Sequence, residues 1–188
     1  ATVREVLVPR NGRTRLIVVT KANSGRSEAI NVGVNTAREP LVALIDADSI
    51  LEPDALVRVT QSFIDDPSRV VAAGGTVRAI NGSTVSNGRI VRLRMPRSWL
   101  ARAQVVEYLR SFLIGRTGWA SMGTLLLISG AFGVYRRDVV IEAGGLDPDS
   151  IGEDFELCLR VHKMMRDRGR DYRVVFVPDP VCWTEAPE

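Results

Sequence analysis

The stretch VALIDADSILEPDAL, residues 42–56, carries an apolar run up to two aspartates and leaves through a proline. On a strand, side chains two positions apart share one face, so Asp46 and Asp48 would stand about 7 Å apart at their Cα atoms. Carboxylates at this spacing repel each other unless a positive group lies between them. Hard oxygen ligands favour Mg²⁺ or Mn²⁺, often with a substrate phosphate as a further ligand. The plainer alternative is a solvated acidic pair before a helix.

Outward from this stretch, apolar strand patterns alternate with helical ones. Pro53 suits the first turn of a helix that follows the two aspartates. Such alternation favours an α/β fold with a largely parallel sheet, whose ligands bind beyond the carboxyl ends of the strands. We expect strands over 14–19, 40–46, 69–80 and 173–177, and helices over 27–37, 53–63, 100–116 and 153–168, with a short helix ending at Gly144 and Gly145.

Composition limits the class of protein. The chain has 188 residues, 45% apolar and 25% charged, which suits one globular domain with a real core. The formal charge is only +3 and no dense basic run occurs, so nucleic acid is not an expected partner. Cys158 and Cys182 are too few for a disulfide framework and have no zinc-ligand company. A reducing compartment is therefore expected.

One segment requires a membrane check. Residues 117–135, TGWASMGTLLLISGAFGVY, carry no charge and are bracketed by Arg116 and Arg136. That length could just span a bilayer. Four glycines and several hydroxyl residues favour a buried strand and loop instead. The start of the chain does not have the pattern of a signal peptide.

Two further segments carry polar side chains near a helix start. KANSGRSEAINVG, residues 21–33, is a loop that leads into a helix amino terminus, which is a natural anion site. SIGEDFELCLRV, residues 150–161, places Glu153 and Asp154 at the start of another helix. Acidic residues there also have a plain explanation, because they interact favourably with the helix dipole.

Four blocks in this order, KANSGRSEAINVG, LIDADSILEPDAL, SGAFGVYRRDVV and GGLDPDSIGEDFELCLRV, resemble the family 2 glycosyltransferases of GT-A fold. Within that family they are most similar to the membrane synthases of cellulose, chitin, hyaluronan and poly-N-acetylglucosamine. The resemblance covers nearly the whole chain. It implies an α/β fold with a mostly parallel sheet flanked by helices.

The resemblance also implies roles for individual residues. Asp46 and Asp48 match the DxD motif that holds a divalent cation on the nucleotide diphosphate. Asp154 matches the general base that acts on the acceptor hydroxyl, with Glu153 beside it in the acidic pair. The remaining matches are a donor-binding set, Lys21, Asn23, Gly25, Arg26 and Asp46, and an acceptor-binding set, Ser129, Gly130, Ala131 and Trp183. Trp183 could equally be a core residue.

The implied activity is inverting transfer of a sugar from a nucleotide-sugar, of UDP type, to a growing polysaccharide or a glycolipid, assisted by Mg²⁺ or Mn²⁺. Residues 1–80 would bind donor and metal, and residues 81–188 would bind acceptor and carry the base. The implied location is the cytoplasmic face of the cell membrane, attached through segments outside this chain. Helix 100–116 could lie against the membrane or simply face the core.

The sequence departs from the family pattern at several points. Arg26 stands where lysine is usual, and Gly152 where threonine is common. The first nucleotide-binding strand and the Gln-x-x-Arg-Trp block have no match, so we expect a partial domain of a longer membrane enzyme.

Two other classes of function remain open. The LIDADSIL stretch also fits a haloacid-dehalogenase-like phosphatase or phosphotransferase, in which the first aspartate is the nucleophile. That family places a lysine between its acidic blocks, and no lysine occurs between residues 22 and 162. The third class is a non-catalytic fragment.

Overall fold

The computed structural model describes residues 2–8 and 16–185, in which sixteen helices and strands follow one another. In chain order, the first half contains β1 (Val3–Leu7), β2 (Val18–Lys21), α1 (Arg26–Thr36), β3 (Leu41–Ile45), β4 (Ile50–Leu51), α2 (Ala55–Asp65) and β5 (Val70–Ala79). The second half contains β6 (Thr84–Ser86), β7 (Arg89–Arg92), α3 (Trp99–Leu109), the π-helix η1 (Arg110–Arg116), α4 (Thr117–Ser121), β8 (Phe132–Arg136), α5 (Arg137–Glu142), α6 (Glu153–Asp167) and β9 (Arg173–Thr184).

The central sheet has five strands in the order β3-β8-β5-β9-β4. The α/β class is confirmed, but the expectation of a mostly parallel sheet is wrong. Only β5 and β9 pair in parallel, whereas β8 runs antiparallel to both β3 and β5, and β4 runs antiparallel to β9. Strand–helix alternation predicts direction only when one helix joins two neighbouring strands. Here a hairpin, a long helix and a loop separate β5 from β8, so that connection leaves the direction of β8 open.

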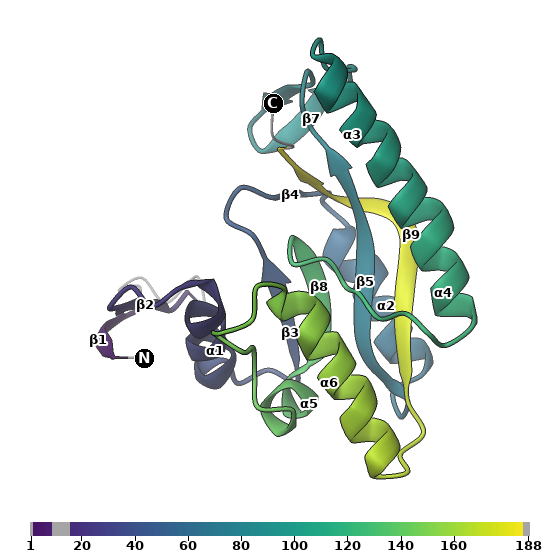
Figure 1. The fold of residues 1–188 in the computed structure, drawn as a ribbon. Helices are drawn as coiled ribbons and strands as arrows, with labels where there is room; N and C mark the ends of the chain where they lie inside the picture. The colour runs from purple at the N-terminus through teal and green to yellow at the C-terminus, as the bar shows by residue number, and fades with distance from the viewer. Residues whose placement is uncertain (1, 9–15, 186–188) are drawn as a thin grey trace.

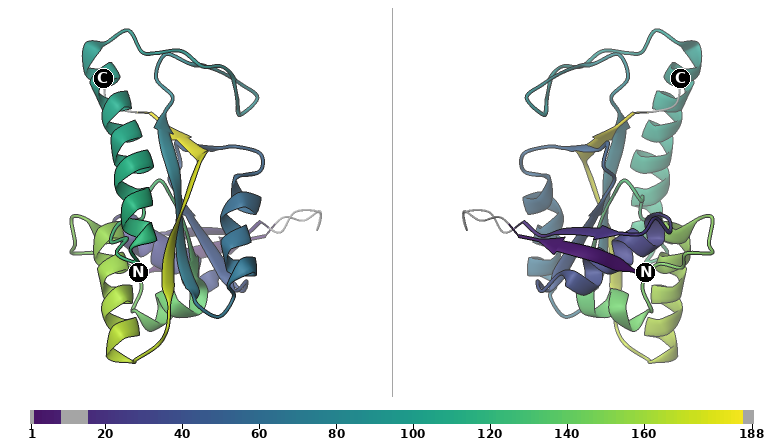
Figure 2. Two further views of the ribbon diagram at one scale, coloured as in Figure 1. Left: turned by 90° about the vertical axis from the view of Figure 1, so that its right-hand side faces the viewer. Right: turned by 90° about the vertical axis from the view of Figure 1, so that its left-hand side faces the viewer.

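Helices cover both faces of this sheet (Figures 1 and 2). On one face, α2 packs on β5 and β8; on the other, α5 and α6 do so. The ten residues of β5 are nearly all buried, as expected for a strand covered on both sides. The two cores are built mainly from Val59, Phe63, Val70, Val77, Phe132 and Val134 on the α2 face, and from Val71, Val140, Leu157, Val161, Met165 and Val174 on the α6 face.

The β1–β2 hairpin lies apart from the central sheet (Figure 1). The strand expected over 14–19 is found as β2, which among the described residues pairs, antiparallel, with β1 only. Residues 14 and 15 of the expected strand lie outside the described residues. β2 leads through the loop of residues 22–25 into α1, so it lies next to the start of that helix in the chain without joining the main sheet.

The helix expected over 100–116 is longer than predicted, because α3, η1 and α4 follow one another without a break. The uncharged segment therefore folds as a short helix, a loop and the buried strand β8. Within the described part of the chain, no helix combines the length and apolarity needed to cross a bilayer. Ala101 and Phe112 face the core, while Trp99 and Ile114 are 78% and 74% exposed. Contact of this outer face with a membrane stays a prediction.

Candidate active site

The two aspartates of the opening stretch lie on a turn rather than on a strand, since β3 ends at Ile45. The backbone N–H of Ser49 donates to the carbonyl oxygen of Asp46 at 3.1 Å and closes that turn. Asp46 is half-buried and Asp48 is exposed. Among the described residues Asp48 has no ion-pair partner, so its carboxylate is available to a ligand.

Arg26, at the start of α1, joins the aspartate turn to the other acidic segment. Its Nε and Nη2 donate to Oδ1 of Asp46 at 3.1 and 2.7 Å, and its Nη1 donates to Glu153. Nη2 also donates to the carbonyl oxygen of Gly130 at 2.8 Å. Burial acts to lower the pKa of Arg26, but the two carboxylates outweigh it and raise that pKa above its ordinary value. Arg26 therefore stays a cation that holds two anions 107 residues apart in the sequence.

The peptide groups of Gly130 connect Arg26 to the predicted base. The carbonyl oxygen of Gly130 accepts from Arg26, while its N–H donates to Oδ2 of Asp154 at 2.9 Å. The other carboxylate oxygen of Asp154 accepts from the N–H of Phe155 at 2.8 Å. A Cβ atom on Gly130 would lie only 2.9 Å from Nη2 of Arg26, so glycine allows this close approach. We call Arg26, Asp46, Gly130, Glu153 and Asp154 the Arg26 cluster.

The rest of the predicted donor-binding set lies in its own loop. Lys21 Nζ donates to the carbonyl oxygen of Ala22 at 2.8 Å and to the hydroxyl of Ser24. Asn23 Oδ1 accepts from the N–H of Gly25 at 3.2 Å. Gly25 has φ of +89°, a left-handed conformation that glycine adopts without steric cost, and it turns the loop into α1. The structure thus brings Arg26 to Asp46 but leaves Lys21 and Asn23 bonded locally.

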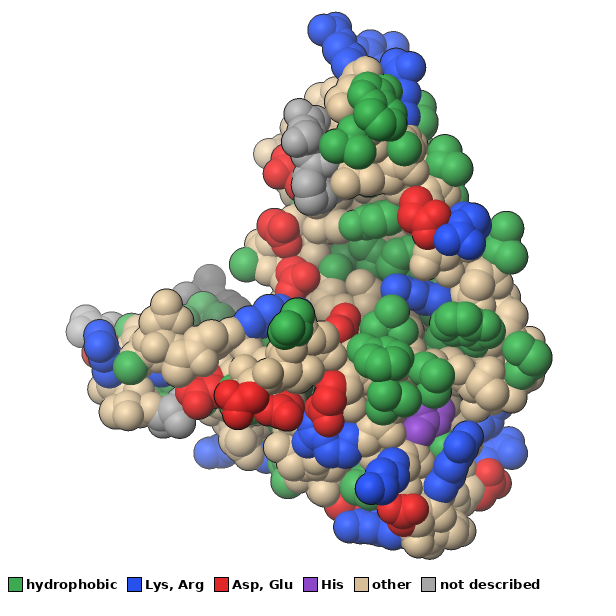
Figure 3. Space-filling model, viewed as in Figure 1, with side chains coloured by type: hydrophobic (Ala, Val, Ile, Leu, Met, Phe, Trp, Pro, Cys, Tyr) green, Lys and Arg blue, Asp and Glu red, His purple; other side chains and the backbone are tan. Residues whose placement is uncertain are grey.

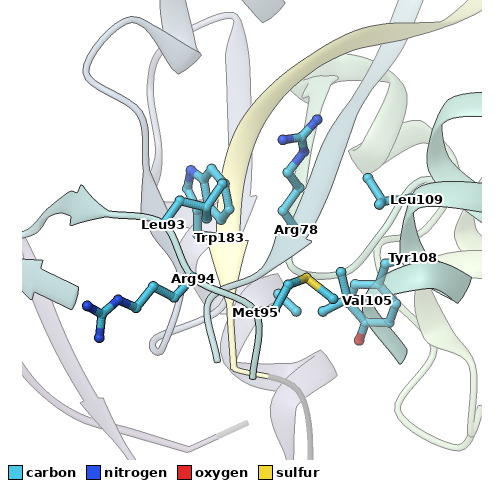
Figure 4. Close-up of a pocket in the computed structure, with 9 residues that line it drawn as sticks. Arg78, Leu93, Arg94, Met95, Val105, Tyr108, Leu109 and Trp183 are labelled. Carbon is cyan, nitrogen blue, oxygen red and sulfur yellow. The ribbon is translucent and has the colours of Figure 1, made fainter. Parts of the chain in front are cut away.

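The predicted acceptor-binding set is divided between two places. Ala131 contacts the aspartate turn, because its carbonyl oxygen accepts from the N–H of Asp46 and the hydroxyl of Ser49, both at 3.4 Å. Trp183 instead lines a separate, mainly apolar pocket of about 260 Å³, in which Arg78 lies over its ring at 5.8 Å (Figure 4). Trp183 is the only member of the predicted site that lines this pocket.

The donor atoms suit a cation that completes its coordination shell with a substrate. No group of three or more His, Cys, Asp or Glu side chains is arranged to hold a metal within residues 2–8 and 16–185. Both bonds from Arg26 to Asp46 end on Oδ1, so Oδ2 and the exposed carboxylate of Asp48 remain. Mg²⁺ is typically held by one or two carboxylates together with phosphate and water, and this donor set fits that pattern.

Sequence reasoning missed Arg116, which is only 8% exposed and lies beside Ser129 in a second cavity. The one sequence feature that pointed to Arg116 was its position directly before the uncharged segment 117–135. His162 has a structural role: its ring nitrogens lie 2.7 Å from the hydroxyl of Tyr172 and 2.8 Å from the carbonyl oxygen of Leu125. Figure 3 shows acidic and basic side chains around the hollow where the α1 side meets the arm that carries α3.

The model of glycosyltransferase-like family 2 matches residues 1–188, so the chain belongs to that family. The expected family and the enzyme class are thereby confirmed.

Among curated proteins, the chain is 29% identical over 175 residues to the poly-β-1,6-N-acetyl-D-glucosamine synthase of Staphylococcus aureus strain COL, covering 92% of this chain and 37% of that protein. The Staphylococcus epidermidis synthase of the same name is 25% identical over 168 residues, with 89% and 36% covered. The chain thus spans little more than a third of the length of these relatives.

Two solved structures share the fold. One is the mannosyltransferase PcManGT of Pyrobaculum calidifontis, in complex with GDP-Man and Mn²⁺, with a TM-score of 0.52, 19% identity, and 87% of this chain and 37% of that chain covered. The other is S. aureus TarS 1-349, with a TM-score of 0.51, 13% identity, and 88% and 42% covered. At these identities the likeness concerns the fold alone.

Proposed function

We propose that this chain is the donor-binding and catalytic part of an enzyme that transfers a sugar from a UDP-sugar to a growing polysaccharide or glycolipid, with inversion at the anomeric carbon. The observation that carries the proposal is the Arg26 cluster, which joins the DxD turn to the acidic pair on α6 through one guanidinium and one glycine. The name of the S. aureus relative supports N-acetylglucosamine as the sugar.

The diphosphate of the donor would lie beside the aspartate turn, within reach of Arg26. A guanidinium has five N–H donors, and the contacts of Arg26 use four of them. The remaining N–H, on Nη1, can donate to a phosphate oxygen while the cluster stays assembled. Residues 1–80 would thus supply the donor site, as the resemblance implies.

Asp46 and Asp48 would hold Mg²⁺ or Mn²⁺ against the diphosphate. When bound, such an ion neutralises negative charge that grows on the leaving group. The presence of Mn²⁺ in the PcManGT complex supports this assignment. Arg26 would assist from the protein side, because its charge is fixed before the reaction begins.

Asp154 would act as the general base. Each of its carboxylate oxygens accepts one backbone N–H, so each keeps capacity for a further hydrogen bond. The acceptor hydroxyl would give its proton to Asp154 as its oxygen bonds to the anomeric carbon and the bond to the diphosphate breaks. The amino terminus of α6 stabilises the negative charge at this position. Glu153 would position Arg26 through their ion pair.

The acceptor would approach from residues 81–188, where Ser129, Gly130 and Ala131 lie between the aspartate turn and Asp154. Attachment to the cytoplasmic face of a membrane would come through segments outside this chain. The exposed apolar side chains along the long helix, among them Trp99, Val106, Ile114 and Trp119, support a place close to that surface.

The first test is calorimetric titration of UDP into the protein with and without Mn²⁺, repeated on Asp48→Asn. We expect Mn²⁺-dependent binding that this substitution abolishes, because it removes one metal ligand. Asp65→Asn, on the exposed side of α2, is the matched control and should bind as the wild type does. UDP binding that is indifferent to Mn²⁺ and to Asp48 would contradict the metal assignment. Absence of UDP binding would favour the non-catalytic alternative; the phosphatase alternative is already excluded by the family match over residues 1–188.

A further inference from the structure

The helix that borders the Arg26 cluster changes its winding at one place. Between α3 and α4, residues Arg110–Arg116 form the π-helix η1. Short π-helical segments widen a helix and recur at functional sites. Phe112 and Arg116, 5% and 8% exposed, face the interior here, whereas Ile114 between them is 74% exposed. The π segment thus carries a charged side chain into the protein.

Arg116 is the only Arg, Lys, Asp or Glu that is buried among the described residues. Its Nη1 has no hydrogen-bond partner, and its guanidinium lies over the ring of Phe112 at 3.8 Å. Burial lowers the pKa of Arg116 to about 10, although the nearby charge of Asp154 acts to raise it. A buried cation without hydrogen bonds destabilises the folded protein, so a ligand that accepts its N–H groups would remove that cost.

Arg116 borders a cavity of about 230 Å³, which we call the Arg116 cavity. The cavity adjoins the Arg26 cluster, because it is lined by Ser129 and Ala131 on either side of Gly130. Its other polar lining residues are Glu107, Tyr108, Ser111 and Thr184. Pockets for drug-sized ligands measure about 300–1,000 Å³, so this smaller cavity suits a ligand of one small ring.

The chemistry of the Arg116 cavity favours a neutral, hydroxyl-rich ligand. An anion would meet the charge of Asp154 nearby, whereas the carboxylate of Glu107 in the lining is already paired with Arg110. An apolar ligand would leave the N–H groups of Arg116 unpaired. A sugar ring has oxygen atoms that accept from a guanidinium, hydroxyl groups that donate to a carboxylate, and faces that pack on Tyr108 and Phe112.

We propose that the Arg116 cavity binds the terminal sugar of the acceptor, and that Arg116 is the residue that recognises a hydroxyl or amide oxygen of that sugar. This inference rests on the proposed function. Arg116, on η1, would hold the terminal sugar of the acceptor beside Asp154. The carboxylate of Asp154 would then receive the proton of the attacking hydroxyl.

The test is binding of methyl N-acetyl-β-D-glucosaminide, followed by saturation-transfer NMR, to the wild type, Arg116→Met and Arg116→Lys. Arg116→Met should weaken binding about 10- to 100-fold, the effect of losing a hydrogen bond to a charged group. Arg116→Lys should keep part of the affinity. Arg166→Met, at the exposed far end of α6, is the matched control and should change nothing.

Two further readouts separate recognition from a structural role. Arg116→Met should leave Mn²⁺-dependent UDP binding unchanged and should not lower the melting temperature. If glycoside binding survives Arg116→Met, or if the wild type binds UDP but no glycoside, the inference is wrong while the proposed function stands. If UDP binding also fails in the wild type, the proposed function itself fails.

Discussion

Two arginines lie near Asp154 in contrasting surroundings. The side chain of Arg26 is 38% exposed, yet it donates to Asp46, Glu153 and Gly130. Arg116 is only 8% exposed, yet its Nη1 has no partner. Water could solvate Arg26 without those bonds, whereas Arg116 has little water to replace missing bonds. Arg26 is thus a cation that holds the residues of a site together, whereas Arg116 is a cation whose N–H groups remain available to a ligand.

The largest effect on activity should come from a change at Asp154, which lies near both arginines. Asp154→Asn keeps an oxygen that can accept from the N–H of Gly130, so the fold should persist, but an amide cannot take the acceptor proton. We expect the rate of sugar transfer to fall about 10²- to 10⁴-fold, the usual contribution of a general base. Initial rates of UDP release, with circular dichroism as the check on folding, measure this. A variant with near wild-type rates would exclude Asp154 as the base.

A second prediction concerns the stability cost of Arg116. Arg116→Met removes an unpaired buried charge, which should raise the free energy of unfolding at neutral pH by about 1–3 kcal/mol. The loss of the cation–π contact with Phe112 reduces this gain. Because the folded pKa, about 10, lies below the unfolded one, the unfolded state binds more protons as pH rises beyond 10. Above this pH the free energy of unfolding of the wild type should therefore rise, and the difference in stability between Arg116→Met and the wild type should become smaller.

Urea unfolding of both proteins at about pH 7 and about pH 11 measures this difference, since other titrating groups largely cancel. An Arg116→Met protein that is clearly less stable than the wild type at neutral pH would instead show that Arg116 supports the fold.

The smallest effect should come from the glycine that links the cluster. A Cβ on Gly130 would meet the end of the Arg26 side chain at 2.9 Å, and that flexible end can shift. Gly130→Ala should therefore weaken Mn²⁺-dependent UDP binding only several-fold, about 1 kcal/mol, with little change in stability. Gly152→Ala, where a Cβ would meet nothing within 4 Å, is the matched control for the same titration. If Gly130→Ala and Gly152→Ala lose the same amount of UDP affinity, then that affinity does not depend on the position of Arg26.

The sequence by itself indicated the family, several of the helices and strands, and the five residues that the structure joins in the Arg26 cluster. Apolar periodicity predicted α1, β3, α2, β5 and α6 to within a few residues, since each pattern reflects burial within one local element. Asp46, Arg26, Gly130 and the acidic pair were predicted as site residues because the motifs that contain them resemble those of the family.

Only the tertiary structure decided which strands are neighbours, which cations are paired and where the cavities lie. Strand direction in the sheet depends on long connections, so β8 could run antiparallel although the pattern predicted parallel strands. Trp183 and Lys21 carry the residue types of a site, but Trp183 lines another pocket and Lys21 is bonded within its own loop. Arg116 looked like the edge of an uncharged segment and is a buried cation. Burial and pairing depend on contacts between residues distant in the chain, and local patterns do not encode them.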